Sequence, residues 1–260
     1  MKSIICAVLI TLLPFISSAS IEIDGSLRLV HNGVQGEVYK GEIKIHNSDK
    51  FEQDAKIYQK ELLYNYKGFT FYDEPTTHNR SNANWIKFSP KMIRLKAGET
   101  AYIQYEVSIP KHDSVKGTYW SVLMVEAVNP IDPNQAGQMN INTLTRYAIQ
   151  LITEVPDPNK GKLIFMEPTL VKEGDKLFLA VDIENSGTHY ISPDVSIEIY
   201  NEKGESIKVI KASKKGLFPT TSSRFKFDLD GVPGGKTYKT VIVAAGANDD
   251  VFGLEYTLYF

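Results

Sequence analysis

The segment GTYWSVLMVEAV, residues 117–128, is the most apolar run of the chain after its N-terminal stretch. A strand with one face in water alternates apolar and polar residues. Here both alternating sets are apolar: Trp120, Val122 and Met124 on one side, and Tyr119, Leu123 and Val125 on the other. We therefore expect a central strand of a sandwich, with one face in the core and the other under a second domain or a long loop.

The rest of the chain repeats a strand pattern. Segments rich in Val, Ile, Tyr and Phe are separated by Gly, Asn, Asp and Pro about every eight to twelve residues, which is typical of a β-sandwich. No stretch has a convincing helical period. In the first half we expect strands near 21–30, 36–47, 53–66, 84–88, 91–95, 100–109, 117–127 and 139–154, with the polar tract 73–84 as a loop. In the second half we expect strands near 162–167, 175–185, 193–200, 205–212, 223–229, 237–245 and 252–260.

A domain boundary is expected in EVPDPNKGK, residues 154–162, where two prolines and polar residues follow a long apolar segment. The predicted fold is all-β, with two tandem immunoglobulin-like β-sandwich domains at 20–156 and 157–260. The seven strands expected in the second half match the number in such a sandwich.

Two local patterns in the second half are typical of this fold. NEKG, residues 201–204, predicts a hairpin turn with Gly204 at positive φ. Tyr238 follows a turn rich in Gly and Pro, at the place where an immunoglobulin-like domain has a tyrosine corner. A half-buried strand tyrosine explains the same pattern equally well.

The N-terminus has the composition of a secretory signal peptide. Residues 1–19 contain one lysine, an apolar stretch and small residues before the expected cleavage after Ala19. The single cysteine, Cys6, lies inside this segment, so the mature chain would have no disulfide. We expect export to the periplasm, with secretion or the cell surface as the alternative. No later apolar run is long enough to span a membrane, and a net charge near zero gives no indication of nucleic-acid binding.

The sequence contains little that predicts catalysis. It has no metalloprotease, nucleophile-elbow or phosphate-loop motif, and its five histidines have no ligand spacing. Asp228 with Asp230, and Asn248 with Asp249 and Asp250, match no full calcium loop and are better explained as turn residues. The prediction is a non-enzymatic protein without a metal or cofactor.

Three passages resemble the periplasmic chaperones of the chaperone–usher pilus pathway. IDGSLRLVHNGVQGEVYKGEIKIHN is similar to that family's first two strands, and MNINTLTRYAIQLITEVPDP to its last strand and linker. A third passage of the family is similar to WIKFSPKMIRLKAGETAYIQY. Pro90, Leu95 and Gly98 match the family's pattern there, and Ala97 stands where proline is usual. The resemblance covers most of 21–156.

The resemblance implies that the protein binds pilin-like or other surface-protein subunits that lack their final strand, with an outer-membrane usher as a further partner. Such chaperones lend an edge strand to the subunit and hold its C-terminal carboxylate with a basic pair. Transferred to this sequence, the lent strand is 139–152, with Met139, Ile141, Tyr147, Ile149 and Leu151 on one face. The first basic residue of the anchor is Arg28, and Gln150 stands where the family has lysine. The place of that lysine is then taken either by Gln150 itself or by Arg146, four residues earlier on the same side of the strand.

The alternative hypothesis is a secreted or surface adhesin or scaffold with tandem immunoglobulin-like domains. In that case 139–152 would be paired on both sides, and binding would lie on loops such as 73–84. The chaperone hypothesis predicts that 139–152 is an edge strand and that Arg28 and Arg146 approach each other. A hydrolase is disfavoured, because the sequence offers no carboxylate pair for it.

Overall fold

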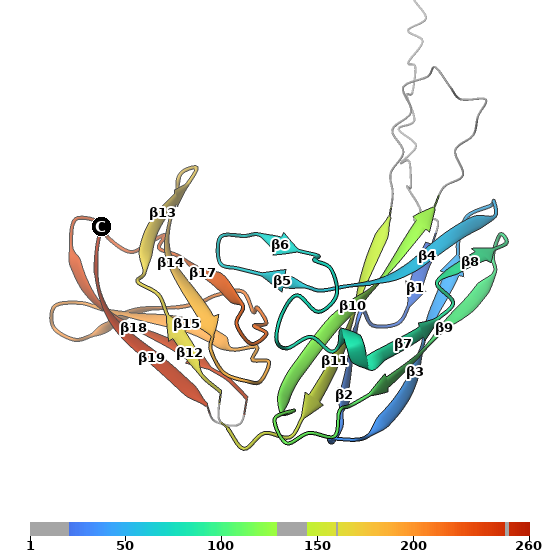
Figure 1. Ribbon diagram of the computed structural model, residues 1–260. Coiled ribbons are helices and arrows are strands. Elements are labelled where there is room, and N and C mark those ends of the chain that lie inside the picture. Colours follow the sequence, from blue (N-terminus) through green and yellow to red (C-terminus); the bar gives the residue numbers. More distant parts are fainter. Residues whose placement is uncertain (1–20, 129–144, 160, 248–249) are drawn as a thin grey trace, which may run out of the picture.

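The structure, a computed structural model, describes residues 21–128, 145–159, 161–247 and 250–260. The described residues form two β-sandwiches side by side, with one short 3-10 turn, η1 (Ala83–Trp85) (Figure 1). The predicted fold class, all-β with two immunoglobulin-like sandwiches in tandem, is confirmed.

The first sandwich is built from the strands between residues 21 and 155. One sheet has the order β1-β3-β9-β7 and the other β2-β11-β10-β4-β8. The strands of the first sheet are β1 (Ile21–Asp24), β3 (Val38–Asn47), β7 (Ile86–Ser89) and β9 (Thr100–Ser108). Those of the second are β2 (Arg28–Asn32), β4 (Gln53–Lys60), β8 (Met92–Leu95), β10 (Gly117–Val128) and β11 (Arg146–Val155). A buried apolar core, which includes Ile45, Ile103, Leu123 and Ile149, lies between the sheets.

The chain changes sheets between β1 and β2, where the sequence predicted one strand over 21–30. Ile21 pairs with Asn47 on β3, whereas Arg28 pairs with Gln150 on β11, in the opposite sheet. Gly25 lies at the break with a φ of +119°, a conformation that residues with a Cβ rarely adopt. This glycine ends the first strand and lets the chain cross to the other sheet.

β10 is the central strand that the sequence predicted. It pairs with β11 on one side and β4 on the other. Leu123 and Val125 lie in the core between the sheets. Trp120, Val122 and Met124 form a second buried cluster with Leu62, Ile152 and Phe218. The outer face is therefore covered both by the segment after β4 and by the second sandwich, which contributes Phe218.

The second sandwich is built from the strands between residues 163 and 259. One sheet contains β12 (Leu163–Phe165), β13 (Thr169–Glu173), β14 (Lys176–Asn185) and β17 (Ser222–Asp228). The other has the order β16-β15-β18-β19, with β15 (Asp194–Tyr200), β16 (Ser206–Lys211), β18 (Thr237–Ala245) and β19 (Val251–Tyr259). β13 was not predicted, because its largely exposed residues, TLVKE, give no clear apolar alternation.

Both local predictions for this sandwich are confirmed. The hydroxyl of Tyr238, which is buried, donates to the Pro233 carbonyl at 2.6 Å, which makes it a tyrosine corner. In the hairpin between β15 and β16, the Gly204 N–H donates to the Asn201 carbonyl at 3.0 Å. Gly204 has a φ of +79°, as the turn requires.

Candidate binding edge at the junction of the two sandwiches

The two sandwiches are joined by direct contacts beside the linker. The N–H of Thr118, on β10, donates to the carbonyl of Thr188 in the second sandwich at 2.8 Å. The ring of Phe218 stacks on Trp120 with centroids 4.5 Å apart. Thr118, Trp120 and Phe218 are 0%, 0% and 2% exposed. The junction is therefore a packed interface, and the linker does not hold the sandwiches together alone.

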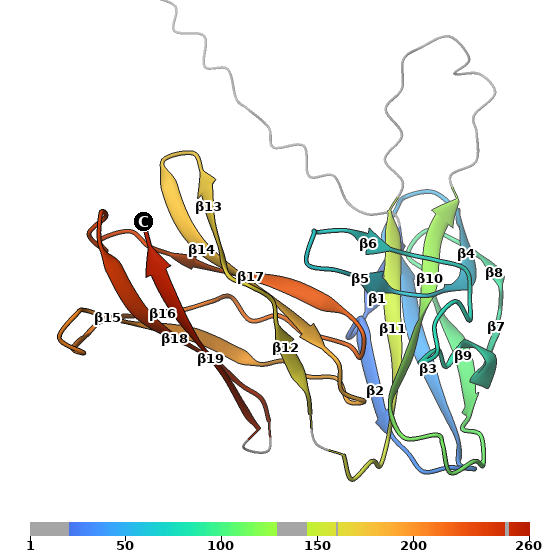
Figure 2. The ribbon, with the colours of Figure 1, turned by 60° about the vertical axis from the view of Figure 1, so that its left-hand side comes forward.

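A hairpin of the first sandwich reaches across to the second. It consists of β5 (Leu63–Tyr64) and β6 (Thr70–Phe71), and it extends from the end of β4 toward β17 in both views (Figures 1 and 2). The Tyr64 hydroxyl donates to the Gly216 carbonyl at 2.7 Å and accepts from the Phe218 N–H at 3.1 Å. The sequence predicted a single strand over 53–66, because it gave no sign that the chain leaves the sheet after Lys60.

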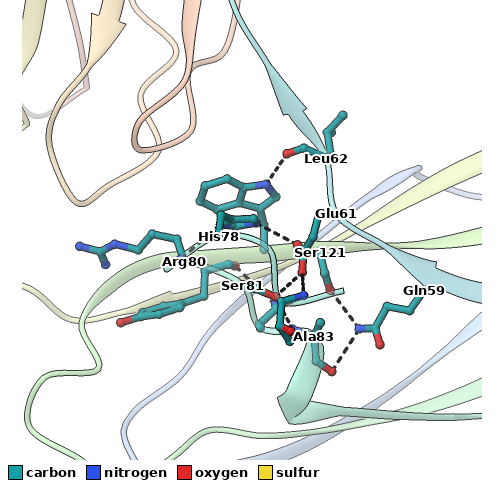
Figure 3. Close-up of polar contacts among 12 residues, drawn as sticks. Gln59, Glu61, Leu62, His78, Arg80, Ser81, Ala83 and Ser121 are labelled. Atoms are coloured by element: carbon teal, nitrogen blue, oxygen red, sulfur yellow. Dashed lines mark hydrogen bonds and ion pairs between the residues drawn. The ribbon is translucent and has the colours of Figure 1, made fainter. Parts of the chain in front are cut away.

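The polar tract predicted as a loop is fixed against β10 by a buried carboxylate (Figure 3). Glu61 has no exposed surface, and it accepts hydrogen bonds from the Thr76 N–H at 2.6 Å, from Nε2 of His78 at 2.9 Å and from the Ser81 hydroxyl. The His78 ring stacks on Trp120 with centroids 4.3 Å apart. These contacts make the tract a cover for the outer face of β10.

β11 has neighbours on both sides only over its second half. It pairs with β10 throughout, but its parallel pairing with β2 begins at Gln150, opposite Arg28. The Gln150 N–H donates to the Leu27 carbonyl at 2.8 Å, so the backbone polar groups of the even-numbered residues of β11 point to the β2 side. No described strand pairs with Arg146 or Ala148 on that side. Within the part of the chain that is described, the first half of β11 is a sheet edge.

Arg28 and Gln150 lie side by side where this edge ends. Their Cα atoms are partners in the parallel pairing of β2 and β11. The guanidinium carbon of Arg28 lies 4.2 Å from the centroid of the Tyr190 ring, which belongs to the second sandwich. A cation of the first sandwich and an aromatic ring of the second therefore meet at the end of the edge, with Gln150 beside Arg28 in the strand register.

Arg146 is not at this place. It lies four residues earlier on β11, which corresponds to roughly 13 Å along a strand. Its Nε is 2.9 Å from Oε2 of Glu126. A hydrogen bond from Tyr58 at 2.5 Å, together with Arg146, keeps the pKa of Glu126 below its usual range. The structure thus brings Arg28 and Gln150 together and leaves Arg146 in an ion pair apart from them.

The side chains expected on the lent strand have different surroundings. Ile149 and Leu151 are 0% and 1% exposed and belong to the core of their own sandwich, which corrects the expectation that they are offered to a partner. Tyr147 is half-buried against the same core. Met139 and Ile141 lie outside the described residues. The alternation of the sequence correctly placed Tyr147, Ile149 and Leu151 on one face of the strand, but that face points into the core of the first sandwich.

A second carboxylate, Glu154, lies near the linker end of β11. Thr118 donates its hydroxyl hydrogen to Oε2 of Glu154 at 2.6 Å, and Nδ1 of His189 is 4.0 Å from the same oxygen. Burial raises the pKa of Glu154, and the hydrogen bond from Thr118 and the charges of His189 and Arg28 offset this only in part. The folded protein therefore binds a proton at Glu154 more readily than the unfolded chain does.

The raised pKa of Glu154 predicts how the protein responds to a neutral substitute. Glu154→Gln should increase the free energy of unfolding at pH 7, because the ionised carboxylate is disfavoured in the folded state. The difference from the wild type should shrink as the pH falls through the raised pKa, since the wild type then becomes neutral as well. Urea denaturation at a series of pH values measures this, with the exposed Glu202→Gln as the control. A constant difference at all pH values would contradict the prediction.

Among the described residues, no three or more His, Cys, Asp or Glu side chains are grouped so as to hold a metal ion. Over the same residues, no helix has the length and apolar character needed to cross a membrane.

Comparison with known proteins gives a match in structure only. No family model matches the sequence, and no curated protein is significantly similar to it. A chain of a chaperone–tip adhesin complex of CFA/I fimbriae biogenesis has a TM-score of 0.51 at 14% identity, over 92% of this chain and 98% of that chain. The chain has the fold of the fimbrial chaperones.

Two further structures are similar to the chain. The class 5 fimbriae chaperone CfaA is 14% identical with a TM-score of 0.48, over 91% of this chain and 98% of that one. The YadV chaperone is 14% identical with a TM-score of 0.46, over 92% of this chain and 100% of that one. The match to the chain of the chaperone–tip adhesin complex covers 92% of this chain, and so includes both sandwiches.

Proposed function

We propose that the protein is an exported, non-enzymatic chaperone for fimbrial-type surface subunits and that it holds a subunit along the free edge of β11. The observation that carries this proposal is that, among the described residues, β11 is paired on one side only before Gln150, with Arg28 directly beside the end of this edge. The signal peptide expected at 1–19 would deliver it to the periplasm, where the subunit and an outer-membrane usher would be its partners.

The chemistry of binding is β-augmentation. The N–H and C=O groups of Arg146 and Ala148 on the free side would pair with a strand of the subunit. Such backbone hydrogen bonds provide affinity that does not depend on the subunit's side chains. Side chains on the lent strand would fill the subunit's groove. Because Ile149 and Leu151 are in the core, this role falls to Tyr147 together with Met139 and Ile141, the latter two outside the described residues.

The end of the edge supplies the anchor for the subunit's C-terminal carboxylate. Arg28 has planar donors that match the two oxygens of a carboxylate, and the Gln150 side-chain amide adds a neutral donor beside it. An Arg–Gln pair has one formal charge, where a pair of basic residues has two. Binding to this anchor should therefore depend less on salt than binding to two cations.

The one-sided pairing of β11 also separates this proposal from the alternative. A surface adhesin or scaffold was expected to have this strand paired on both sides and to bind through loops such as 73–84. The edge at Arg146 and Ala148 and the buried bonds of Glu61 to that loop support the chaperone proposal.

The proposal is tested by removing one backbone donor from the edge. In Ala148→Pro the N–H on the free side is lost and no hydrogen bond to β10 is broken, because the Ala148 N–H points away from β10. Co-purification with a fimbrial subunit that lacks its final strand should fall about tenfold or more, since a hydrogen-bonding position is lost and proline obstructs pairing. Ala148→Val, which adds similar bulk and keeps the N–H, should retain capture. Equal capture by the two variants would contradict binding at this edge.

A further inference from the structure

Tyr190 connects the second sandwich to Arg28. It lies between β14 and β15, and its N–H donates to the Thr118 hydroxyl oxygen at 2.6 Å. Its ring is tilted against Phe218 with centroids 4.9 Å apart. A side chain at Gly216 would meet the Tyr190 hydroxyl oxygen at 1.9 Å, so the ring fills the space over this glycine. The ring is thus fixed by its backbone, by an aromatic neighbour and by a close packing contact.

The free side of this fixed ring carries the Arg28 guanidinium. The distance of 4.2 Å from the guanidinium carbon to the ring centroid is within the range of a cation–π contact. A guanidinium that lies over a ring uses its face for that contact, and the N–H donors at its edge stay available for a carboxylate. No carboxylate of the described residues forms an ion pair with Arg28.

We propose that Tyr190 is the positioning residue of the Arg28 anchor, so that the carboxylate site is assembled from both sandwiches. The inference rests on the proposed function, because it concerns the same anchor. An arginine side chain has many rotamers, and ordering it on binding costs free energy. The Tyr190 ring orders it beforehand, which matters more here than in a two-cation anchor because Gln150 supplies no charge.

The two halves of the anchor also make it sensitive to the angle between the sandwiches. Arg28 is on β2 of the first sandwich, whereas Tyr190 moves with the second. A rotation that broke the Thr118–Thr188 hydrogen bond would carry the ring away from the guanidinium. The carboxylate site is therefore complete only in the arrangement of the sandwiches described above.

The test measures the affinity of the protein for a peptide that carries a free C-terminal carboxylate. The probe is a synthetic peptide with the last ten or so residues of the subunit retained in the capture experiment, made as the free acid and as the C-terminal amide. Fluorescence anisotropy gives the affinity of each for the wild type and for Tyr190→Leu, Tyr190→Phe and Arg28→Ala. Tyr190→Leu should weaken binding of the acid about five- to twentyfold and leave binding of the amide unchanged. Tyr190→Phe, which keeps the ring, should bind the acid within about twofold of the wild type.

The outcomes separate this inference from the proposed function. If Tyr190→Leu binds the acid as tightly as the wild type while Arg28→Ala does not, Tyr190 has no positioning role and the anchor stands. If Tyr190→Leu weakens acid and amide equally, the residue acts only on the general structure and the inference fails. If Arg28→Ala binds the acid like the wild type, the carboxylate anchor itself is wrong, and the inference falls with it. Thermal melting of each variant shows that it is folded.

Discussion

Trp120→Ala should lower the free energy of unfolding by about 3–5 kcal/mol, as expected for removing a fully buried large aromatic side chain. Trp120 is 0% exposed, and its ring lies between His78 of the covering loop and Phe218 of the second sandwich. Its Nε1–H donates to the Leu62 carbonyl at 2.8 Å, and the alanine variant leaves this carbonyl without its partner. The substitution therefore weakens the cover of β10 and the contact between the sandwiches together.

Urea denaturation followed by circular dichroism measures the loss. Tyr102→Ala is the control: it also removes an aromatic side chain from the first sandwich, but Tyr102 is 46% exposed, and the cost should be about 1 kcal/mol or less. Similar losses for the two variants would show that the stack on Trp120 contributes little beyond ordinary surface packing.

Arg28→Ala should reduce capture of a fimbrial subunit on the order of a hundredfold, because removing one partner of a charged hydrogen-bonded pair typically costs 2–5 kcal/mol. The fold should be retained, since Arg28 is exposed on β2 and its side chain lies on the surface of the Tyr190 ring. The measurement is the dissociation constant of the purified complex, at low and moderate salt.

The matched control for Arg28→Ala is Arg94→Ala. Arg94 is also an arginine on a strand of the first sandwich, but its side chain is 66% exposed and pairs with Asp54 on its own sheet. This variant should capture the subunit as the wild type does. If both arginine variants lost capture to the same degree, a general loss of positive charge would explain the result, and the anchor at Arg28 would not be needed.

The fold class was predictable from the sequence, because a strand that is apolar on both faces must lie inside a sheet that is covered on both sides. The pattern in 117–128 required two covers, and the structure provides both. The tyrosine corner at Tyr238 was predictable from its turn, but deciding between a corner and an ordinary strand residue required the hydrogen bond to Pro233. Short elements with weak alternation, such as β13 and the β5–β6 hairpin, were missed.

The candidate site was only partly predictable. Period-2 alternation shows which residues share a face, and it placed Tyr147, Ile149 and Leu151 together. It cannot show what that face contacts, and here it contacts the core. The choice between Arg146 and Gln150 beside Arg28 depends on the register between two strands far apart in the sequence. The role of Tyr190 was not predictable, because nothing in the sequence around a single loop tyrosine of the second half indicates a contact with Arg28.

In the proposed mode of binding, the change of sheet at Gly25 would determine how much of β11 is open to a partner. Because β2 starts only at Arg28, its pairing stops at Gln150, and no strand of the described residues covers Ala148 and Arg146 on that side. If the crossing came two residues earlier in the chain, β2 would extend over Ala148 and take one docking position from any partner. Under the proposed function, the position of this one glycine would therefore set the length of β11 that the protein can share with a subunit.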